Sequence, residues 1–107
     1  MKDVIISGGE NISSIEVESV LLRHPAVQEV AIVGLPHERW GEAPHAFVVL
    51  RQGAQTDEAE LREFARANLA HFKAPHSVTF VNELPKTATG KIQKYVLRAR
   101  QSTIAAQ

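Results

Sequence analysis

The sequence predicts an α+β domain: a small mixed sheet of about three main strands plus an N-terminal hairpin, flanked by two to three helices. Two observations carry this prediction. Apolar β-forming runs occur at 30–33 and 46–50, whereas helical spacing of apolar residues occurs at 13–23 and 57–70. The resulting order of elements does not repeat a strand–helix unit. The 107 residues, 44% of them hydrophobic and 22% charged, suit one globular domain spanning 1–107.

Turn and cap signals define the elements of the first half. Three β-formers followed by Gly8 and Gly9 predict a hairpin. Ser13 and Glu16 have the spacing of a capping box, so a helix should begin there, and Pro25 should stop it. The expected elements are a hairpin over 4–12, a helix to about Arg23 with two apolar flanks (Ile15 with Leu22, and Val17 with Leu21) against a sheet, and antiparallel strands over 26–35 and 42–51.

The second half should hold two further helices and one strand. Thr56 or Asp57 is expected to cap a helix that ends near Ala70, with an apolar face at helical spacing. The remaining elements are a loop over 71–75, a strand over 76–83 with Val78, Phe80 and Val81 facing inward, a lysine-rich loop, a helix from Ile92 to about Arg100, and a frayed tail over 102–107.

Composition narrows the classes of function. Twelve basic and twelve acidic side chains cancel, so net charge favours neither nucleic acid nor a membrane surface. There is no cysteine, which excludes disulfides, thiol nucleophiles and cysteine-based metal sites, and the five histidines lack metal-ligand spacing. No apolar run approaches a membrane span and no signal peptide opens the chain, so we expect a cytoplasmic location. After Glu83 every charged residue is basic, which fits an anionic ligand, an acidic partner surface or a solvated tail.

The segment 84–94 is the strongest local signal for chemistry. Pro85 should end the preceding strand, and Gly90 permits a tight turn that presents Lys91 at its tip. A lysine is a compact charge with three donors, suited to a phosphate or a carboxylate. Pro85 and Ile92 stand where a P-loop needs glycine and Ser or Thr, so this is not a P-loop. A solvated basic turn would explain the same residues.

Three other loops could contact a ligand. Gly8 and Gly9 either supply turn angles or let a ligand pass close to bare backbone. Trp40 either packs or forms a ligand platform, and Phe72, next to Lys73, either stacks on a flat ring or fills the core. These residues by themselves indicate sites for an anionic ligand but no reaction.

Several motifs, in order along nearly the whole chain, resemble the C-terminal lid domain of AMP-forming acyl-CoA synthetases of the adenylate-forming superfamily. They are residues 2–12 with 16–18, 24–27, 34–36 with 40–42, 72–75, and 84–87 with 90–92. The wording Ser-Gly-Gly-Glu-Asn-Ile-Ser-Ser at 7–14 and Gly-Lys-Ile-Gln-Lys at 90–94 is most similar to fatty-acyl-CoA ligases that act on short- to medium-chain acids.

The resemblance implies a two-step ligase reaction. A carboxylic acid attacks ATP, with Mg²⁺ expected to accompany the nucleotide, to give an acyl-adenylate and pyrophosphate; the thiol of coenzyme A then displaces AMP. The small domain would rotate on a hinge and offer a different face to each step. Its partner would be a large N-terminal adenylation domain that holds the acid pocket. Because 107 residues cannot contain that domain, an excised lid that is inactive alone is expected.

The resemblance also implies roles for individual residues. Lys91 matches the lysine that enters the site for adenylation, supported by Pro85, Lys86, Thr87 and Gly90. Lys2 matches the hinge, and Ser7, Gly8, Gly9, Glu10 and Asn11 match the loop that enters for thioester formation. Phe72, with Lys73, stands where some relatives stack the coenzyme A adenine, Trp40 falls beside the pantetheine path, and Ala74 replaces a basic residue that some relatives use for the phosphates.

Two other readings remain open. A carrier-protein-dependent adenylation domain uses the same lid, although its lysine motif often ends Gly-Lys-x-Asp-Arg, unlike residues 90–94 here. The other is a stand-alone binding module without catalysis.

Overall fold

The computed structural model describes residues 4–105, and side chains are described through residue 100. Lys2, the expected hinge residue, therefore lies outside the described residues. The elements are β1 (Val4–Ser7), β2 (Glu10–Ser13), α1 (Ser14–Leu21), β3 (Val27–His37), β4 (Gly41–Leu50), α2 (Glu58–Asn68), the 3₁₀ turn η1 (His71–Lys73), β5 (Ser77–Phe80) and α3 (Lys94–Ala105). The predicted α+β class, with three main strands, a hairpin and three helices, is confirmed.

β4 is the central strand of the sheet. β3 pairs with it antiparallel along its whole length, from Val27 opposite Leu50 to His37 opposite Gly41. β5 pairs with β4 in parallel over four residues, which makes the sheet mixed. The β1–β2 hairpin meets β4 at a single pair, Ser7 opposite Gly41. The hairpin is therefore joined to one end of the sheet rather than built into it.

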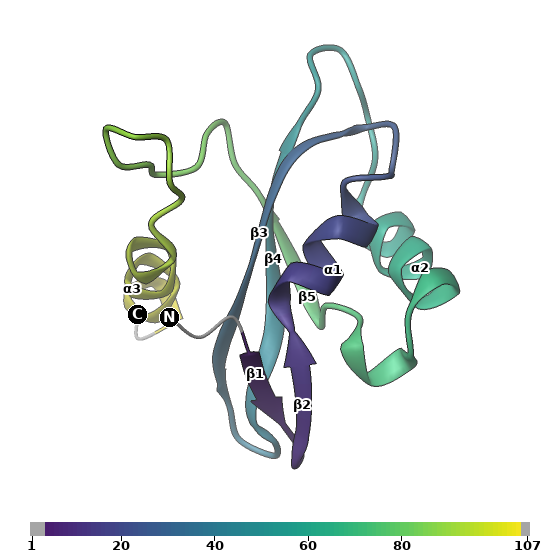
Figure 1. Cartoon of the computed structure of the whole chain (residues 1–107), viewed down its shortest axis with the longest axis vertical. Coiled ribbons are helices and arrows are strands. Elements are labelled where there is room, and N and C mark those ends of the chain that lie inside the picture. The colour runs from purple at the N-terminus through teal and green to yellow at the C-terminus, as the bar shows by residue number, and fades with distance from the viewer. Residues whose placement is uncertain (1–3, 106–107) are drawn as a thin grey trace.

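Helices cover both faces of this sheet. Figure 1 shows α1 and α2 on one face and α3 on the other. Each side has its own cluster of buried apolar residues, because alternate residues of β3 and β4 point to opposite faces. The α1–α2 side includes Ile12, Val17, Leu21, Ile32, Val48 and Leu61, and the α3 side includes Ala31, Val33, Phe47, Val49, Leu84 and Leu97. Burying one large aliphatic side chain contributes roughly 1.5–3 kcal/mol.

The first helix is capped as predicted but buries only one of its two expected flanks. Ser13 Oγ accepts the Glu16 N–H at 3.3 Å. Val17 and Leu21 are buried one turn apart, whereas Ile15 is 56% exposed and Leu22 is 46% exposed. The prediction that both flanks pack on the sheet was wrong, because an eight-residue helix lying on a sheet offers it a single stripe.

Other boundaries differ from the sequence predictions. The expected connection at 34–41 is mostly strand, since β3 continues to His37 and β4 begins at Gly41. Asp57, not Thr56, caps α2. β5 ends at Phe80, whose side chain is 39% exposed instead of facing inward, because this strand lies at the edge of the sheet.

The C-terminal helix starts later and runs further than predicted. Ile92 pairs with Lys86 in an isolated bridge, so α3 begins at Lys94. It continues to Ala105, where a frayed tail was expected, and residues 106–107 lie outside the described part. Among the described residues, no helix has the length and apolar character needed to span a membrane.

Candidate functional site

The two loops with ligand-binding signals lie toward opposite ends of the molecule. The lysine loop (residues 84–93) lies near the top of Figure 1, before α3, and the glycine turn (residues 7–10) lies at the bottom, between β1 and β2. The longest dimension of the domain is 37 Å. The lysine loop and the glycine turn therefore form two separate candidate sites.

The lysine loop is a tight hairpin held by its own hydrogen bonds. The Thr87 N–H donates to the Lys91 carbonyl oxygen at 2.8 Å, and the Gly90 N–H donates to the Thr87 carbonyl oxygen at 2.9 Å. Thr87 Oγ1 also accepts the Lys91 N–H at 3.1 Å. Gly90 has φ of 89°, in the left-handed region that favours glycine. These bonds fix the backbone that carries the Lys91 side chain.

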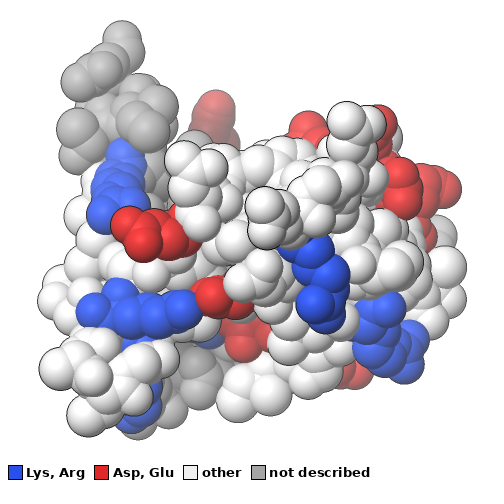
Figure 2. All heavy atoms as spheres, turned by 90° about the horizontal axis from the view of Figure 1, so that it is seen from above, with Lys and Arg blue, Asp and Glu red and all other residues white. Residues whose placement is uncertain are grey.

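The three lysines in and beside this loop have different surroundings. Lys86 Nζ lies 2.8 Å from the Glu29 carboxylate, and Lys94 Nζ lies 2.8 Å from that of Glu18. Lys91 is exposed and, within the part of the chain whose side chains are described, makes no ion pair. Figure 2, which views this end of the domain, shows basic side chains beside acidic ones rather than one continuous basic patch. Lys91 is thus the member of the trio whose ammonium group is available to an incoming anion.

The glycine turn needs both of its glycines. Gly8 has φ of 58° and Gly9 has φ of 83°, angles that side chains disfavour. The Gly8 N–H donates to the Trp40 carbonyl oxygen at 3.0 Å, and a Cβ on Gly8 would lie 3.4 Å from Trp40 Cδ1. A Cβ on Gly9 would meet nothing within 4 Å. Gly8 therefore packs against the indole, whereas Gly9 faces open space.

A side chain also ties the hairpin to the sheet. Glu42 Oε1 accepts the Ile6 N–H at 3.3 Å. The Glu42 carboxyl group lies over Gly34, where an added Cβ would approach it to 3.0 Å. Gly34 thus leaves room for the tether that holds the glycine turn in place.

Trp40 both packs and faces solvent. Its ring stacks on His37, with centroids 4.5 Å apart and planes 9° apart, and the His76 ring meets it edge-on at 4.6 Å. His37 Nδ1 accepts the N–H groups of Arg39 and Trp40, which fixes the turn between β3 and β4. The indole remains 36% exposed. Trp40 therefore packs against the two histidines and also lines a pocket with its open face, and its role toward a ligand stays a prediction.

That pocket has a volume of about 580 Å³ and joins segments far apart in the sequence. It brings together five of the predicted coenzyme A residues, but Gly9, Asn11 and Lys73 do not line it. Phe72 is 43% exposed, which argues against its filling the core, while Lys73 Nζ pairs with Glu16 at 2.9 Å. The lining residues are Ser7, Gly8, Glu10, Trp40, Arg62, Arg66, His71, Phe72, Ala74, Pro75 and His76.

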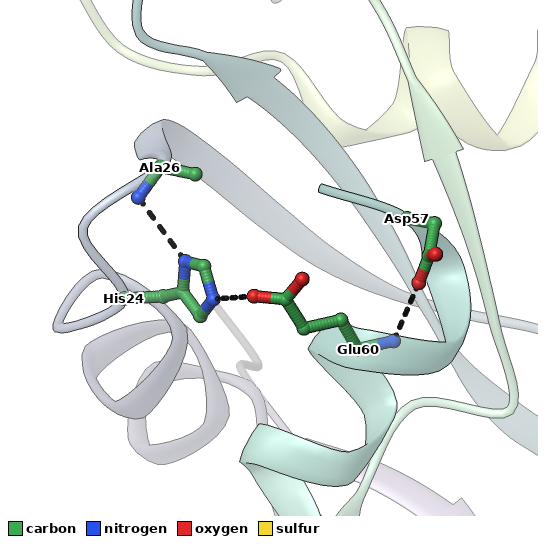
Figure 3. Close-up of polar contacts among 4 residues, drawn as sticks. All are labelled: His24, Ala26, Asp57 and Glu60. Atoms are coloured by element: carbon green, nitrogen blue, oxygen red, sulfur yellow. Dashed lines mark hydrogen bonds and ion pairs between the residues drawn. The ribbon is translucent and has the colours of Figure 1, made fainter. Parts of the chain in front are cut away.

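α2 supplies the two arginines of this pocket, and a buried histidine fixes it to the turn between α1 and β3 (Figure 3). His24 Nδ1 accepts the Ala26 N–H at 3.1 Å, so Nε2 carries the proton and donates to Glu60 Oε2 at 2.8 Å. The Phe64 ring meets the imidazole edge-on at 5.1 Å. Asp57 caps the same helix by accepting the Glu60 N–H at 2.7 Å. The histidine contacts fix α2 against the turn that follows α1, and the Asp57 cap fixes the first turn of α2.

The basic residues of the pocket were missed from the sequence. Arg62 and Arg66 lie one helical turn apart on α2, and no site role was predicted from the sequence for them or for His71 and His76. Burial lowers the pKa of His76 below its ordinary value of 6.5, and the positive charges of His37, Arg62 and Arg66 lower it further. An i, i+4 arginine pair just before the Phe-Lys-Ala-Pro motif was the signal that could have revealed this cluster.

A second buried histidine is structural. His45 Nδ1 lies 2.6 Å from Ser77 Oγ, and its Nε2 lies 2.7 Å from Thr79 Oγ1, so the ring joins β4 to β5. Burial lowers the pKa of His45, and the Glu58 carboxylate offsets this only in part. Among the described residues, no three His, Asp or Glu side chains gather closely enough to hold a metal ion.

A family model and the sequence relatives of this chain point to the same family. The sequence model of the family described as AMP-binding enzyme C-terminal domain matches residues 16–91. The chain is 58% identical over 99 residues to the probable CoA ligase CCL11 of Humulus lupulus, covering 91% of this chain and 18% of that protein. It is 54% identical over 99 residues to the 2-methylpropanoate–CoA ligase CCL4 of the same plant, again covering 91% of this chain and 18% of the relative.

Solved structures agree with the sequence relatives. ATP-bound MatB from Rhodopseudomonas palustris superposes with a TM-score of 0.91 at 42% identity, covering 96% of this chain and 20% of that one. A fatty acyl CoA synthetase from Mycobacterium tuberculosis gives 0.89 at 45% identity, covering 95% of this chain and 20% of that structure. The chain thus spans about a fifth of the length of these relatives. It belongs to the AMP-binding enzyme C-terminal domain family, the small domain found in acyl-CoA synthetases and related adenylate-forming enzymes.

Proposed function

We propose that this chain is the C-terminal lid domain of an acid–CoA ligase that converts a carboxylic acid, ATP and coenzyme A into acyl-CoA, AMP and pyrophosphate. The observation that carries the proposal is the pocket beside the glycine turn, which combines an aromatic face with arginines and histidines. Coenzyme A has the matching parts: a flat adenine, several phosphates and a narrow pantetheine arm. Lys91, at the other end of the domain, makes no ion pair with the described side chains and supplies a second, separate function.

Lys91 is the residue we assign to adenylate formation. In that step a carboxylate oxygen attacks the α-phosphorus of ATP, the bond to the bridging oxygen breaks, and pyrophosphate leaves. Two anionic groups approach each other, so a positive charge placed between them lowers the barrier. Lys91 is exposed on a hydrogen-bonded loop, as such a role requires. Mg²⁺ is expected with ATP, but no residue of this chain is proposed to hold it.

The glycine turn and the pocket are assigned to thioester formation. In that step the sulfur of coenzyme A attacks the acyl carbonyl carbon, and AMP leaves. Gly9, with open space at its Cα, lets the pantetheine arm pass close to the backbone, and the exposed Phe72 ring offers a stacking surface for adenine. Arg62 and Arg66 supply positive charge for the phosphates, which the buried Ala74 cannot do. Glu10 places one negative charge at the same pocket.

The acid substrate and the location in the cell are narrower proposals. The wording of the glycine turn favours short- to medium-chain fatty acids, while relatives are named for 2-methylpropanoate and trans-cinnamate. The acid pocket is expected in the large N-terminal domain that we propose as the partner. Some relatives are named as peroxisomal, so the cytoplasmic location is best tested by imaging the tagged full-length protein.

A grafted enzyme tests the function directly. This chain replaces the matching region of the Humulus lupulus 2-methylpropanoate–CoA ligase, to which it is 54% identical. We expect the grafted enzyme to release pyrophosphate with 2-methylpropanoate and to form its CoA thioester, and the isolated chain to do neither. A grafted enzyme that folds but forms no adenylate would contradict the proposal. Acyl transfer to a phosphopantetheinyl carrier protein in preference to free coenzyme A would instead support the carrier-dependent reading.

A further inference from the structure

The ion pair between Glu29 and Lys86 lies where it can control the position of the lysine loop. Lys86 Nζ donates a hydrogen bond to Glu29 Oε2 at 3.0 Å and lies 2.8 Å from Oε1, where the contact is an ion pair without hydrogen-bond geometry. The two residues are 57 positions apart, and the pair connects β3 to the start of the lysine loop. This ion pair holds the lysine loop against β3.

The backbone of β3 is adapted to this contact. The pairing of β3 with β4 shifts register between Val27 and Glu29. Such a bulge inserts an extra residue and re-aims the side chains beside it. Glu29 follows the shift directly, and its side chain is only 29% exposed. The local distortion of the strand therefore coincides with the carboxylate that meets Lys86.

The loop transmits this anchor to Lys91. Lys86 pairs across the loop with Ile92, the neighbour of Lys91, and the Thr87 N–H donates to the Lys91 carbonyl oxygen. Any displacement of Lys86 must therefore move the backbone of Lys91 or break these bonds. The pair has a second effect, because it occupies Lys86 and leaves Lys91 as the loop's unpaired ammonium group within the described side chains.

We propose that Glu29 is a positioning residue for adenylate formation: through Lys86 it holds the lysine loop in the geometry that presents Lys91. This rests on the proposed role of Lys91. Glu29 touches no substrate; it acts through the loop. The second anchor, between Glu18 and Lys94 at 2.8 Å, holds the far end of the loop, but Glu18 also accepts the Ile32 N–H and so serves the sheet as well. Glu29 is therefore the cleaner residue to test.

The first measurement uses the chain itself and needs no activity. Backbone ¹⁵N relaxation is measured for wild type, Glu29→Gln, Lys86→Ala and the reversed pair Glu29→Lys with Lys86→Glu. We expect lower order parameters across residues 86–92 in both single variants and recovery in the reversed pair. Glu63→Gln, an exposed carboxylate on α2, is the matched control and should leave the loop unchanged. Unchanged order parameters in Glu29→Gln would overturn the proposal.

The second measurement separates the two half-reactions in the grafted enzyme. We expect Glu29→Gln to slow adenylate formation at saturating ATP by roughly tenfold, less than the hundredfold that a 1 Å misplacement can cost. Thioester formation from supplied acyl-adenylate should not change, and the reversed pair should recover most of the rate. Equal losses in both half-reactions would mean general damage and refute a positioning role. A grafted enzyme without activity would count against the proposed function, while the relaxation data would still decide whether Glu29 holds the loop.

Discussion

The two ends of this domain are built in different ways: the lysine loop is one local hairpin, and the pocket end is assembled from several segments. The lysine loop is local: it is one hairpin, closed by its own hydrogen bonds, in which Lys86 is paired and Lys91 is exposed. The pocket end is assembled from the β1–β2 turn, the β3–β4 turn, α2 and the η1 segment, and it offers stacked rings and several charges. A single point charge suits the meeting of two anions, whereas a large ligand needs area and several contacts. Under the function that we propose, each end of this small domain serves one of the two steps.

The largest effect is expected from removing the point charge. Lys91→Ala in the grafted enzyme should lower the rate of adenylate formation by roughly 10²–10³, the usual cost of losing one group that stabilises developing charge. Conversion of supplied acyl-adenylate to the thioester should stay near wild type. Pyrophosphate release and acyl-CoA formation, measured separately, check this. Lys73→Ala, which removes a lysine at the other end, should not slow adenylate formation.

The next largest effect is expected on the KM for coenzyme A when an arginine of the pocket is removed. Arg66→Ala or Arg62→Ala should raise the KM for coenzyme A by roughly tenfold, since a charge-assisted contact contributes about 1.5–3 kcal/mol. Adenylate formation should be unaffected. Coenzyme A fragments of decreasing phosphate content, titrated against both variants, would show which phosphate each arginine contacts. The pocket would lose its assigned role if neither substitution changed the KM for coenzyme A.

A substitution in the glycine turn is expected to have a smaller effect on stability and on the rate of thioester formation. Gly9→Ala places a side chain at φ of 83° without any clash, so it isolates backbone strain of roughly 1–2 kcal/mol. We expect a loss of that size in the free energy of unfolding, measured by denaturant titration, and slower thioester formation. Gly53→Ala, at φ of 79° and also without neighbours, is the matched control, with similar strain but no effect on the reaction. Equal slowing by both variants would remove the glycine turn from the mechanism.

The smallest effect is the pH dependence of stability. The pKa of His45 is lowered in the folded state, so the unfolded chain takes up a proton first as pH falls below about 6.5. Stability attributable to His45 is complete above that pH and declines below it, by at most about 1.4 kcal/mol per pH unit. The free energy of unfolding, compared at about pH 7.5 and about pH 5.5, should differ less in His45→Gln than in wild type. The His76 pKa is also lowered, so some dependence should remain in the variant.

The sequence was a good guide where the signal is local. The Ser13 cap, the apolar face of α2 and the glycine angles depend on neighbouring residues, and all three were predicted. Continuous apolar runs at 30–33 and 46–50 likewise marked β3 and β4. The lysine loop was identified for the same reason, since its turn chemistry lies within ten residues.

Features that depend on contacts between residues far apart in the sequence could not be predicted from local patterns. Lys86 meets Glu29 across 57 positions, and no pattern near Lys86 announces that partner. The arginines of α2 have the spacing of a solvated helix face, and only the packing of α2 beside the glycine turn makes them part of a pocket. Ile15 and Leu22 stay exposed because α1 is short and has one stripe to bury. Tertiary contacts decided each of these cases.

The division of labour between the two ends is tested most directly by a crossed single-turnover experiment. Lys91→Ala and Arg66→Ala are each introduced into the grafted enzyme, and both half-reactions are timed in both variants. We predict a crossed result, in which Lys91→Ala loses adenylate formation alone and Arg66→Ala impairs thioester formation alone, at subsaturating coenzyme A. If each variant slowed both half-reactions to the same extent, the two ends would not serve separate steps.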